Sequence, residues 1–370
     1  MLRFLLIFIS VYTFMNGLVY FKAKALLPDR WGLHYFLLLF LVLMVAAPMG
    51  VRFLEKNGYE GPARLLAYLG YNWMGFVFLS LWGFLAAGVI GLIFKLLDAV
   101  MGTNLPSLTG KGGTAIVFTV VLLTCIYGYR EAQSITVEHT EIKTGKLPQG
   151  MDRLKIAQIS DVHLGLINGK EHLQRIVNLI RAEEPDILVA TGDIVDGDMA
   201  GNGEIHDLMK QIRPRFGKYA VTGNHEFYAG LAQALETIER SGFRVLRGEG
   251  VTVEGIFNIV GIDDPTGGSA TNEATLLASS QNGLFTLFLK HRPEVPEESR
   301  GLFDLQLSGH AHRGQIFPFR YFTGMAYPMQ NGLYDLGKGS MLYASRGSGT
   351  WGPPMRVLSP PEVTIIELVR

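Results

Sequence analysis

The sequence predicts a membrane-embedded helical region in its N-terminal third and an α/β domain in the remaining two-thirds. Long apolar stretches fill the first third of the 370-residue chain, whereas the rest alternates short apolar runs with amphipathic stretches. The formal net charge is zero, so the chain lacks a global basic field and we expect no nucleic-acid partner. Its single cysteine, Cys125, excludes an intrachain disulfide and a cluster of thiolate metal ligands.

Four apolar stretches have the length of membrane-spanning helices. They run over residues 4–21, 33–50, 72–94 and 113–129, and a helix needs about 17–25 residues to cross the hydrocarbon core. The first stretch could instead be a cleaved signal peptide, but no convincing small-residue cleavage site follows it and three more stretches come after it. We therefore expect about four spanning helices within residues 1–130, a linker over 131–150 and a second domain over 151–370.

The distribution of basic residues favours one orientation in the membrane. With four spans, the N-terminus, the loop after the second span and the second domain share one side. That side carries Arg3, Arg52, Lys56, Arg64, Arg130, Lys143 and Lys146, and the other side carries Lys22, Lys24, Arg30, Lys95 and Lys111. Because excess positive charge marks the cytoplasmic side, we expect a multi-pass protein of the cell's inner or plasma membrane with its second domain in the cytoplasm.

The second domain alternates predicted strands and helices. Strands are expected at 154–160, 187–190 and 219–221, with helices over 170–184, which stops before Pro185, and over 231–241. Further short strands are expected at 243–246, 255–261, 283–289, 305–307, 341–344 and 362–368. This alternation is typical of a layered α/β fold.

Polar segments follow five of these apolar runs. They are Asp161-Val162-His163, Gly192-Asp193-Ile194-Val195-Asp196-Gly197, Gly223-Asn224-His225-Glu226, Lys290-His291-Arg292-Pro293 and Gly309-His310-Ala311-His312. Five of the nine histidines fall in these segments. Loops at the carboxyl ends of strands converge on one crevice in α/β folds, so we expect these side chains to meet.

The residue types in these segments point to a metal site. Residues two apart on an extended segment face the same way, so Asp161 and His163 can share an ion, as can His310 and His312. Carboxylate and imidazole without thiolate suit manganese, iron or zinc, and one carboxylate can bridge two ions. Each segment alone has a simpler explanation as a turn or a helix cap. All five together, in this order, favour metal binding.

These five segments closely resemble the motifs of the calcineurin-like metallophosphoesterase superfamily, in the same order. The resemblance extends from Leu154 to the C-terminus. It is nearest to a bacterial membrane-anchored phosphodiesterase branch, which lies close to hydrolases of UDP-diacylglucosamine, and it includes the late segment 345–356. The resemblance implies a four-layer α/β/β/α sandwich and two divalent metal ions.

The resemblance also assigns roles. The first metal would be held by Asp161, His163, Asp193 and His312, and the second by Asp193, Asn224, His291 and His310, with Asp193 bridging. His225 would not ligate a metal; it would protonate the leaving-group oxygen or stabilise the phosphoryl charge, and Asp196 would orient it.

Other residues are less sharply indicated. The branch usually has threonine where this chain has Ala311, and Arg313 adds a positive charge beside the motif. Arg292, Arg313 and Arg346 are candidates for binding substrate phosphate, although a surface role is as reasonable for each. The aromatic stretch 317–327 could line a lipid-facing groove or be core, and His172 and His206 read as surface residues.

We expect metal-dependent hydrolysis of a phosphodiester or pyrophosphate bond on a membrane-associated lipid or lipid-nucleotide substrate. The helical region motivates this expectation, because it would hold the site near the bilayer. One alternative is a phosphomonoesterase or protein phosphatase of the same fold. A non-catalytic membrane sensor is a further alternative, which the complete ligand set disfavours.

Overall fold

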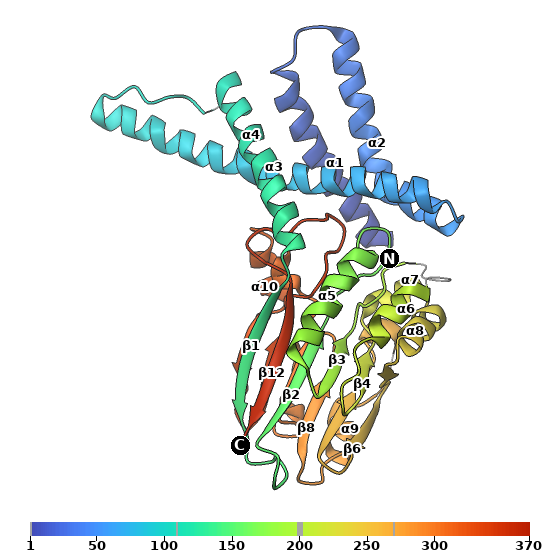
Figure 1. Cartoon of the computed structure of the whole chain (residues 1–370). Coiled ribbons are helices and arrows are strands. Elements are labelled where there is room, and N and C mark those ends of the chain that lie inside the picture. The colour runs from blue at the N-terminus through green and yellow to red at the C-terminus, as the bar shows by residue number, and fades with distance from the viewer. Residues whose placement is uncertain (1, 109, 198–202, 269–270) are drawn as a thin grey trace. The chain divides into compact units, whose positions relative to one another are not determined.

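The structure is a computed structural model that describes residues 2–108, 110–197, 203–268 and 271–370. The chain divides into two compact units (Figure 1). One comprises residues 1–130 with 352–355, and the other comprises residues 131–351 with 356–370. We call the first the helical unit and the second the catalytic unit.

The helical unit contains four long helices. They are α1 (Leu2–Lys24), α2 (Trp31–Lys56), α3 (Glu60–Met101) and α4 (Lys111–Gln133), the last of which ends in the catalytic unit. All four are long and apolar enough to cross a membrane. The third helix has 42 residues, more than the predicted 72–94, because Glu60 lies in its first turn and left-handed Gly102 ends it. Within the unit, the Trp73 indole donates to Asn16 Oδ1 at 2.8 Å.

The catalytic unit is built on two six-stranded sheets. The first has the order β1-β12-β2-β3-β4-β5 and the second β10-β11-β9-β8-β7-β6. The strands of the first sheet are β1 (Thr136–Lys143), β12 (Glu362–Val369), β2 (Arg153–Ile159), β3 (Ile187–Thr191), β4 (Lys218–Val221) and β5 (Arg244–Val245). Those of the second are β10 (Gly332–Asp335), β11 (Met341–Ala344), β9 (Leu305–Ser308), β8 (Phe285–Leu289), β7 (Phe257–Gly261) and β6 (Glu249–Val253).

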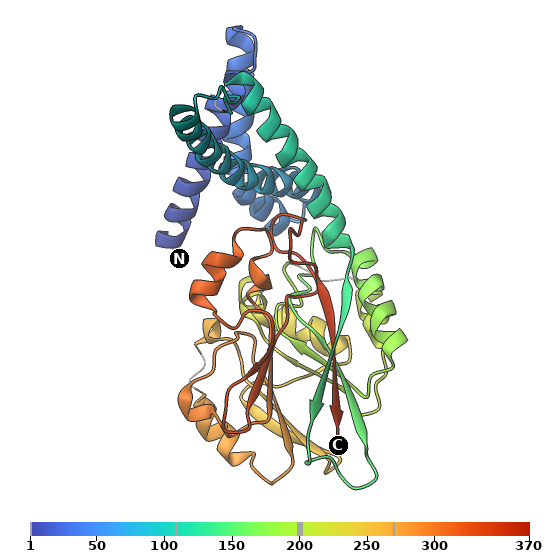
Figure 2. The same ribbon diagram turned by 90° about the vertical axis from the view of Figure 1, so that its left-hand side faces the viewer.

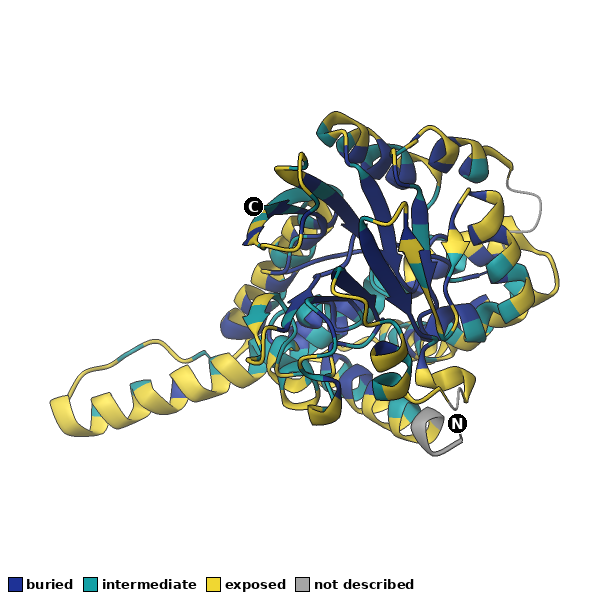
Figure 3. Ribbon diagram, turned by 90° about the horizontal axis from the view of Figure 1, so that it is seen from below, coloured by how far each residue is buried: buried dark blue, intermediate teal, exposed yellow. Residues whose placement is uncertain are grey.

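Helices cover the outer face of each sheet. The catalytic unit contains α5 (Lys170–Glu183), α6 (Gly203–Lys210), α7 (Asn224–Ala229), α8 (Leu231–Arg240), α9 (Glu273–Ser279) and α10 (Arg320–Ala326). In Figure 2, α5 lies on one side of the paired sheets and α9 on the other. The inner strands β3, β7, β8 and β9 are buried along their whole length, whereas the edge strands β1, β6 and β10 are partly exposed (Figure 3).

Alternation along the strands builds three apolar layers. In β3, Leu188 points into the core beneath α5 and α6, and Val189 points into the core between the two sheets. In β8, Leu287 joins the core between the sheets and Phe288 packs beneath α9. The layers therefore run helix, sheet, sheet, helix, and the predicted four-layer fold is confirmed.

One predicted segment is wrong. We expected a linker over 131–150, but residues 136–143 form β1, which pairs in parallel with β12 along its whole length. Its sequence, TVEHTEIK, carries polar residues on most positions, and the strand is fixed by pairing with the distant C-terminal strand rather than by its own pattern.

Candidate metal centre

The predicted metal ligands meet where the loops after β2, β3, β4, β8 and β9 converge. Three groups of side chains bring their ligand atoms within 4.8 Å of one another: Asp161, His163 and His312; His163, Asp193 and His225; and Asp193, His291 and His310. Asp193 and His163 each belong to two groups. Asn224, the remaining predicted ligand, is buried beside them, and its Oδ1 finds no hydrogen-bond partner among the described residues.

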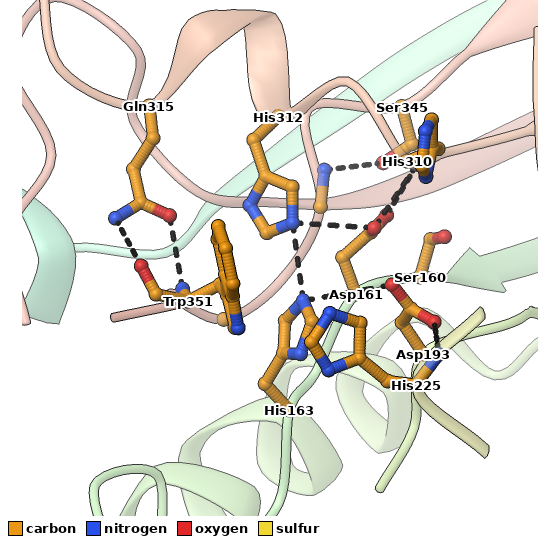
Figure 4. A network of polar contacts seen from close by, with 12 residues as sticks. Ser160, Asp161, His163, Asp193, His225, His310, His312, Gln315, Ser345 and Trp351 are labelled. Carbon is orange, nitrogen blue, oxygen red and sulfur yellow. Dashed lines mark hydrogen bonds and ion pairs between the residues drawn. The ribbon is translucent and has the colours of Figure 1, made fainter. Parts of the chain in front are cut away.

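The distances between facing atoms fit bound cations. His163 Nε2 and His312 Nε2 are 3.1 Å apart (Figure 4). His310 Nδ1 and His291 Nε2 are also 3.1 Å apart. Asp161 Oδ1 lies 3.2 Å from His312 Nε2, and Asp193 Oδ2 lies 3.2 Å from His291 Nε2. Nitrogen and oxygen ligand atoms converging at this spacing form a donor set that suits borderline divalent metals.

The backbone at the site is held in an uncommon conformation. Positive φ is rare for residues other than glycine, and eleven such residues occur among the described ones. Seven of the eleven are Asp161, His163, Asp193, His310, His312, Arg313 and Gln315. Concentration of backbone strain at one place is typical of functional sites.

Two glycines allow the loops to approach one another closely. A Cβ at Gly309 would overlap Ser160 Oγ and Asp161 Oδ2, and a Cβ at Gly223 would overlap the Asp193 carboxylate. The motif glycines are therefore required by the contact between loops from different strands.

Three further side chains support the predicted ligands, the buried Glu226 and Arg356 and the half-buried Tyr327, and sequence reasoning gave none of them a role. Glu226 accepts hydrogen bonds from the backbone N–H groups of Asp193, Ile194, Val195 and Gly223, at 2.7–3.1 Å. Tyr327 Oη lies 2.9 Å from His310 Nε2. Arg356 is fully buried, donates to several backbone carbonyls, and lies 3.1 Å from His312 Nδ1.

In both His291 and His310, one ring nitrogen is held by a hydrogen bond and the other faces the cluster. His291 Nδ1 donates to the carbonyl of Thr191 at 2.7 Å, which leaves Nε2 for a metal. His310 Nε2 pairs with Tyr327, which leaves Nδ1 for a metal. Such partners set the tautomer and the orientation of metal-binding histidines.

His225 and Asp196 form a close pair at the edge of the cluster. His225 Nδ1 donates to Asp196 Oδ1 at 2.5 Å. Burial lowers the pKa of His225, but the carboxylates of Asp193 and Asp196 outweigh it and raise this pKa to about 9. Burial raises the pKa of Asp196, but the nearby imidazoles of His163 and His225 outweigh it and hold this pKa well below its usual range.

Two exposed aromatic rings flank His225. The rings of Tyr228 and Trp351 lie edge-on to the imidazole, with centroids 5.4 and 5.5 Å away. Both are more than half exposed. They form an aromatic rim beside His225, open to a bound molecule.

The three candidate arginines differ in their surroundings. Arg292 is paired with Asp264 through two hydrogen bonds of 2.7 and 3.0 Å. Arg346 is buried and paired with Glu138 and Glu362. Arg313 is half-buried, and among the described residues it makes no hydrogen bond or ion pair. Most guanidinium donors of Arg346 are used inside the domain, whereas those of Arg313 are available.

The histidines outside the motifs are less exposed than expected. His172, predicted to lie on the surface, is buried on α5, and its Nε2 lies 2.9 Å from the carbonyl of Ser348. His206 is half-buried and contacts Ser241 Oγ at 3.3 Å. Both lie on helix faces that pack inward, which their helical spacing alone did not reveal.

Comparison with known proteins gives the family. A sequence profile described as "Calcineurin-like phosphoesterase" matches residues 154–314. An "Uncharacterized metallophosphoesterase" of Aquifex aeolicus is 38% identical over 257 residues, which cover 68% of this chain and 98% of that protein.

Two vertebrate relatives have names that refer to a membrane. A "Transmembrane protein with metallophosphoesterase domain" of Danio rerio is 28% identical, with 94% of this chain and 82% of that protein covered. The protein of the same name from Bos taurus is 30% identical over 67% of this chain and 60% of its own length. With its four apolar helices, this chain is a membrane protein, and it belongs to the calcineurin-like metallophosphoesterase family of divalent-metal-dependent phosphoester hydrolases.

Proposed function

We propose that the chain hydrolyses a phosphodiester or pyrophosphate bond of a membrane-associated lipid or lipid-linked nucleotide, with two divalent metal ions. The main support for a diester or pyrophosphate substrate is the exposed aromatic rim beside His225, formed by Tyr228 and Trp351. If His225 protonates the leaving-group oxygen, the rest of the leaving group must lie beside His225. A rim of two aromatic rings at this place suits a bulky leaving group.

The carboxylate, imidazole and amide side chains of this cluster suit two divalent cations, which would be manganese, iron or zinc. Asp161, His163, Asp193 and His312 would hold one, and Asp193, Asn224, His291 and His310 the other. When bound, such a pair activates water at neutral pH and offsets the charge that develops on the phosphoryl oxygens. The shared position of Asp193 in two ligand groups supports its bridging role.

The chain's own acid is His225. Asp196 stays ionised and accepts the hydrogen bond from Nδ1, so the second proton of the imidazolium resides on Nε2. As the bond between phosphorus and the leaving oxygen breaks, this proton passes from Nε2 to that oxygen. A positioned acid of this kind contributes about 10²–10⁴-fold to the rate.

Charge near the site favours a diester over a monoester. A phosphomonoester carries nearly two negative charges at neutral pH, whereas a diester carries one. Among the three candidate arginines, Arg292 and Arg346 are already neutralised by carboxylates, and Arg313 has no such partner. We infer that Arg313 contacts a phosphate oxygen of the substrate.

The proposal places the catalytic unit on the cytoplasmic face of the cell's inner or plasma membrane. The bilayer is then both anchor and source of substrate. The excess of basic residues on the side shared by the N-terminus and the catalytic unit supports this orientation.

Purified full-length chain with manganese tests the proposal. We expect it to hydrolyse bis-p-nitrophenyl phosphate faster than p-nitrophenyl phosphate. We expect His225→Ala to lower turnover of the diester by about 10²–10⁴-fold while the protein keeps its metal content. A preference for the monoester would favour the phosphatase alternative. Absence of turnover with manganese, iron and zinc would favour the sensor.

A further inference from the structure

The exposed apolar side chains of the catalytic unit are concentrated on one helix. Among the described residues of this unit, eight large apolar side chains are exposed: Tyr228, Phe319, Tyr321, Phe322, Met325, Leu333, Trp351 and Leu358. Four of the eight lie on α10 or at the residue before it, and Met325 is 75% exposed. An apolar cluster of this kind on an otherwise polar surface marks an interaction site.

The segment around α10 has the composition of a membrane interface. From Arg313 to Asn331 it contains two arginines and no acidic residue. The Arg320 guanidinium lies over the rings of Phe317 and Tyr321, 5.1 Å from each centroid. Aromatic rings and arginine together are favoured at the level of lipid headgroups, where anionic lipids add attraction for the positive charge.

The loop that carries Trp351 is hydrogen-bonded to the segment that precedes α10. The side chain of Gln315 binds both backbone groups of Trp351, accepting from its N–H at 2.9 Å and donating to its carbonyl at 3.0 Å. The backbone of Phe317 donates to Val357 at 3.0 Å. We call Phe319, Tyr321, Phe322, Met325 and Trp351 the aromatic face.

The aromatic face lies at the end of the catalytic unit where the last spanning helix enters. The first residue of β1, Thr136, is paired with Glu362, the first residue of β12, which is the next strand after Trp351 in the chain. The carboxylate of Glu131 accepts from the backbone N–H groups of Leu358 and Ser359, at 3.1 and 2.9 Å. In Figures 1 and 2, α10 and the start of β1 lie at the same end of this unit.

Chain connectivity therefore brings this end of the unit to the bilayer. The apolar part of α4 ends at Tyr129, two residues before Glu131. A helix rises about 1.5 Å per residue, so Glu131 lies about 3 Å beyond the apolar segment. The loop bound to Glu131, and the helix attached to that loop, must then lie close to the membrane surface.

We propose that the aromatic face is inserted into the headgroup region of the bilayer that the chain spans, and that it admits a membrane lipid phosphate to the metal centre. The face borders the site at two points. Tyr327, the residue after α10, is bonded to His310, and the Trp351 ring contacts His225. Insertion itself does not depend on the proposed function, whereas the admission of a lipid substrate rests on it.

Depth-dependent quenching tests the insertion in the full-length chain. A single environment-sensitive fluorophore is attached at Met325→Cys in a Cys125→Ala background, in phosphatidylcholine–phosphatidylglycerol nanodiscs. The matched control carries the fluorophore at Ala278→Cys, an exposed position on α9, which lies at the opposite end of the unit (Figure 1). We expect lipids spin-labelled near the headgroup to quench the fluorophore at 325 strongly and the one at 278 little.

Both other outcomes at 325 would overturn the proposal. A water-like emission without quenching would mean that the face is open to solvent. An apolar emission without quenching would mean that protein covers the face, either the helical unit of the same chain or a second copy.

Two activity measurements separate this inference from the proposed function. Phe322→Glu with Met325→Glu should lower hydrolysis of a lipid phosphodiester in vesicles by about tenfold or more, because two carboxylates oppose insertion. Turnover of soluble bis-p-nitrophenyl phosphate should stay within about twofold, since neither residue is in the metal centre or its rim. The control pair, Ala278→Glu with Ser279→Glu, should change neither. If the Phe322/Met325 variant hydrolysed the vesicle substrate as fast as the unmodified chain, the face would not admit lipid to the metal centre. If the unmodified chain cleaved no diester, the proposed function would be wrong, but the quenching result would still stand.

Discussion

The proton on His225 depends on its carboxylate neighbours, and this makes a prediction about pH. Asp193 and Asp196 raise the pKa of His225 to about 9 against the opposing effect of burial. The acid form is present below this pKa and is lost as pH rises through it. Asp196→Asn removes one of the two charges, so the alkaline fall in kcat/KM should move to lower pH by about one unit or more. An unchanged alkaline limb, with metal content intact, would show that Asp196 does not hold this proton.

Tyr327 is predicted to act on metal binding through His310. Tyr327→Phe removes the hydroxyl that contacts His310 Nε2 at 2.9 Å. Loss of such an outer partner typically costs about 10–100-fold in metal affinity, which competition with a chelator would measure. Tyr321→Phe, an exposed tyrosine on the same aromatic segment, is the matched control and should leave the affinity unchanged. Equal affinities for the two variants would refute the role of Tyr327.

At the scale of the elements, Glu226 joins the turn after β3 to the turn after β4. Its two oxygens accept from four backbone N–H groups in a fully buried position. Glu226→Gln replaces one acceptor oxygen with a donor, so buried N–H groups lose their partner. We expect the free energy of unfolding of the catalytic unit to fall by about 2–4 kcal/mol, measured by chemical denaturation in detergent. Glu239→Gln, an exposed change on α8, should have almost no effect.

Sequence pattern predicted the elements whose own residues define them. The strand β3 is a continuous buried run, and α5 has apolar residues at helical spacing on one face, so both were found from local sequence. The edge strands β1, β6 and β10 mix polar and apolar residues, and their pairing with distant strands decides their structure. Helix α10 was hidden because its apolar residues are exposed rather than packed in a core.

The same distinction applies to the site. The predicted ligands lie in short motifs after strands, where residue type and position both carry information. Tyr327 and Arg356 contact His310 and His312 across 17 and 44 residues of chain, and nothing in their local sequence signals those contacts. The aromatic character of 317–327 and the position of Arg356 in segment 345–356 were the available signals, and neither specified a partner.

For the whole molecule, the number of spanning helices determines which side the metal centre faces. If all four candidate spans cross the bilayer, the N-terminus and the catalytic unit share one side of the membrane. The segment between α1 and α2 then lies on the opposite side. Basic residues near the ends of the spans favour the cytoplasm for the catalytic unit, and we predict that orientation.

Accessibility of two engineered cysteines checks it. In a Cys125→Ala background, Ala278→Cys reports on the catalytic unit and Asp29→Cys on the exposed segment between α1 and α2. A membrane-impermeant maleimide should label position 29 but not position 278 in right-side-out vesicles of a bacterial expression host, and the reverse in inside-out vesicles. The two positions are joined by three spans, so they must give opposite results if all four helices cross. Labelling of both from one side would mean that a helix does not span, and labelling of 278 alone in right-side-out vesicles would place the metal centre outside the cytoplasm, where it would meet a different pool of lipids and metals.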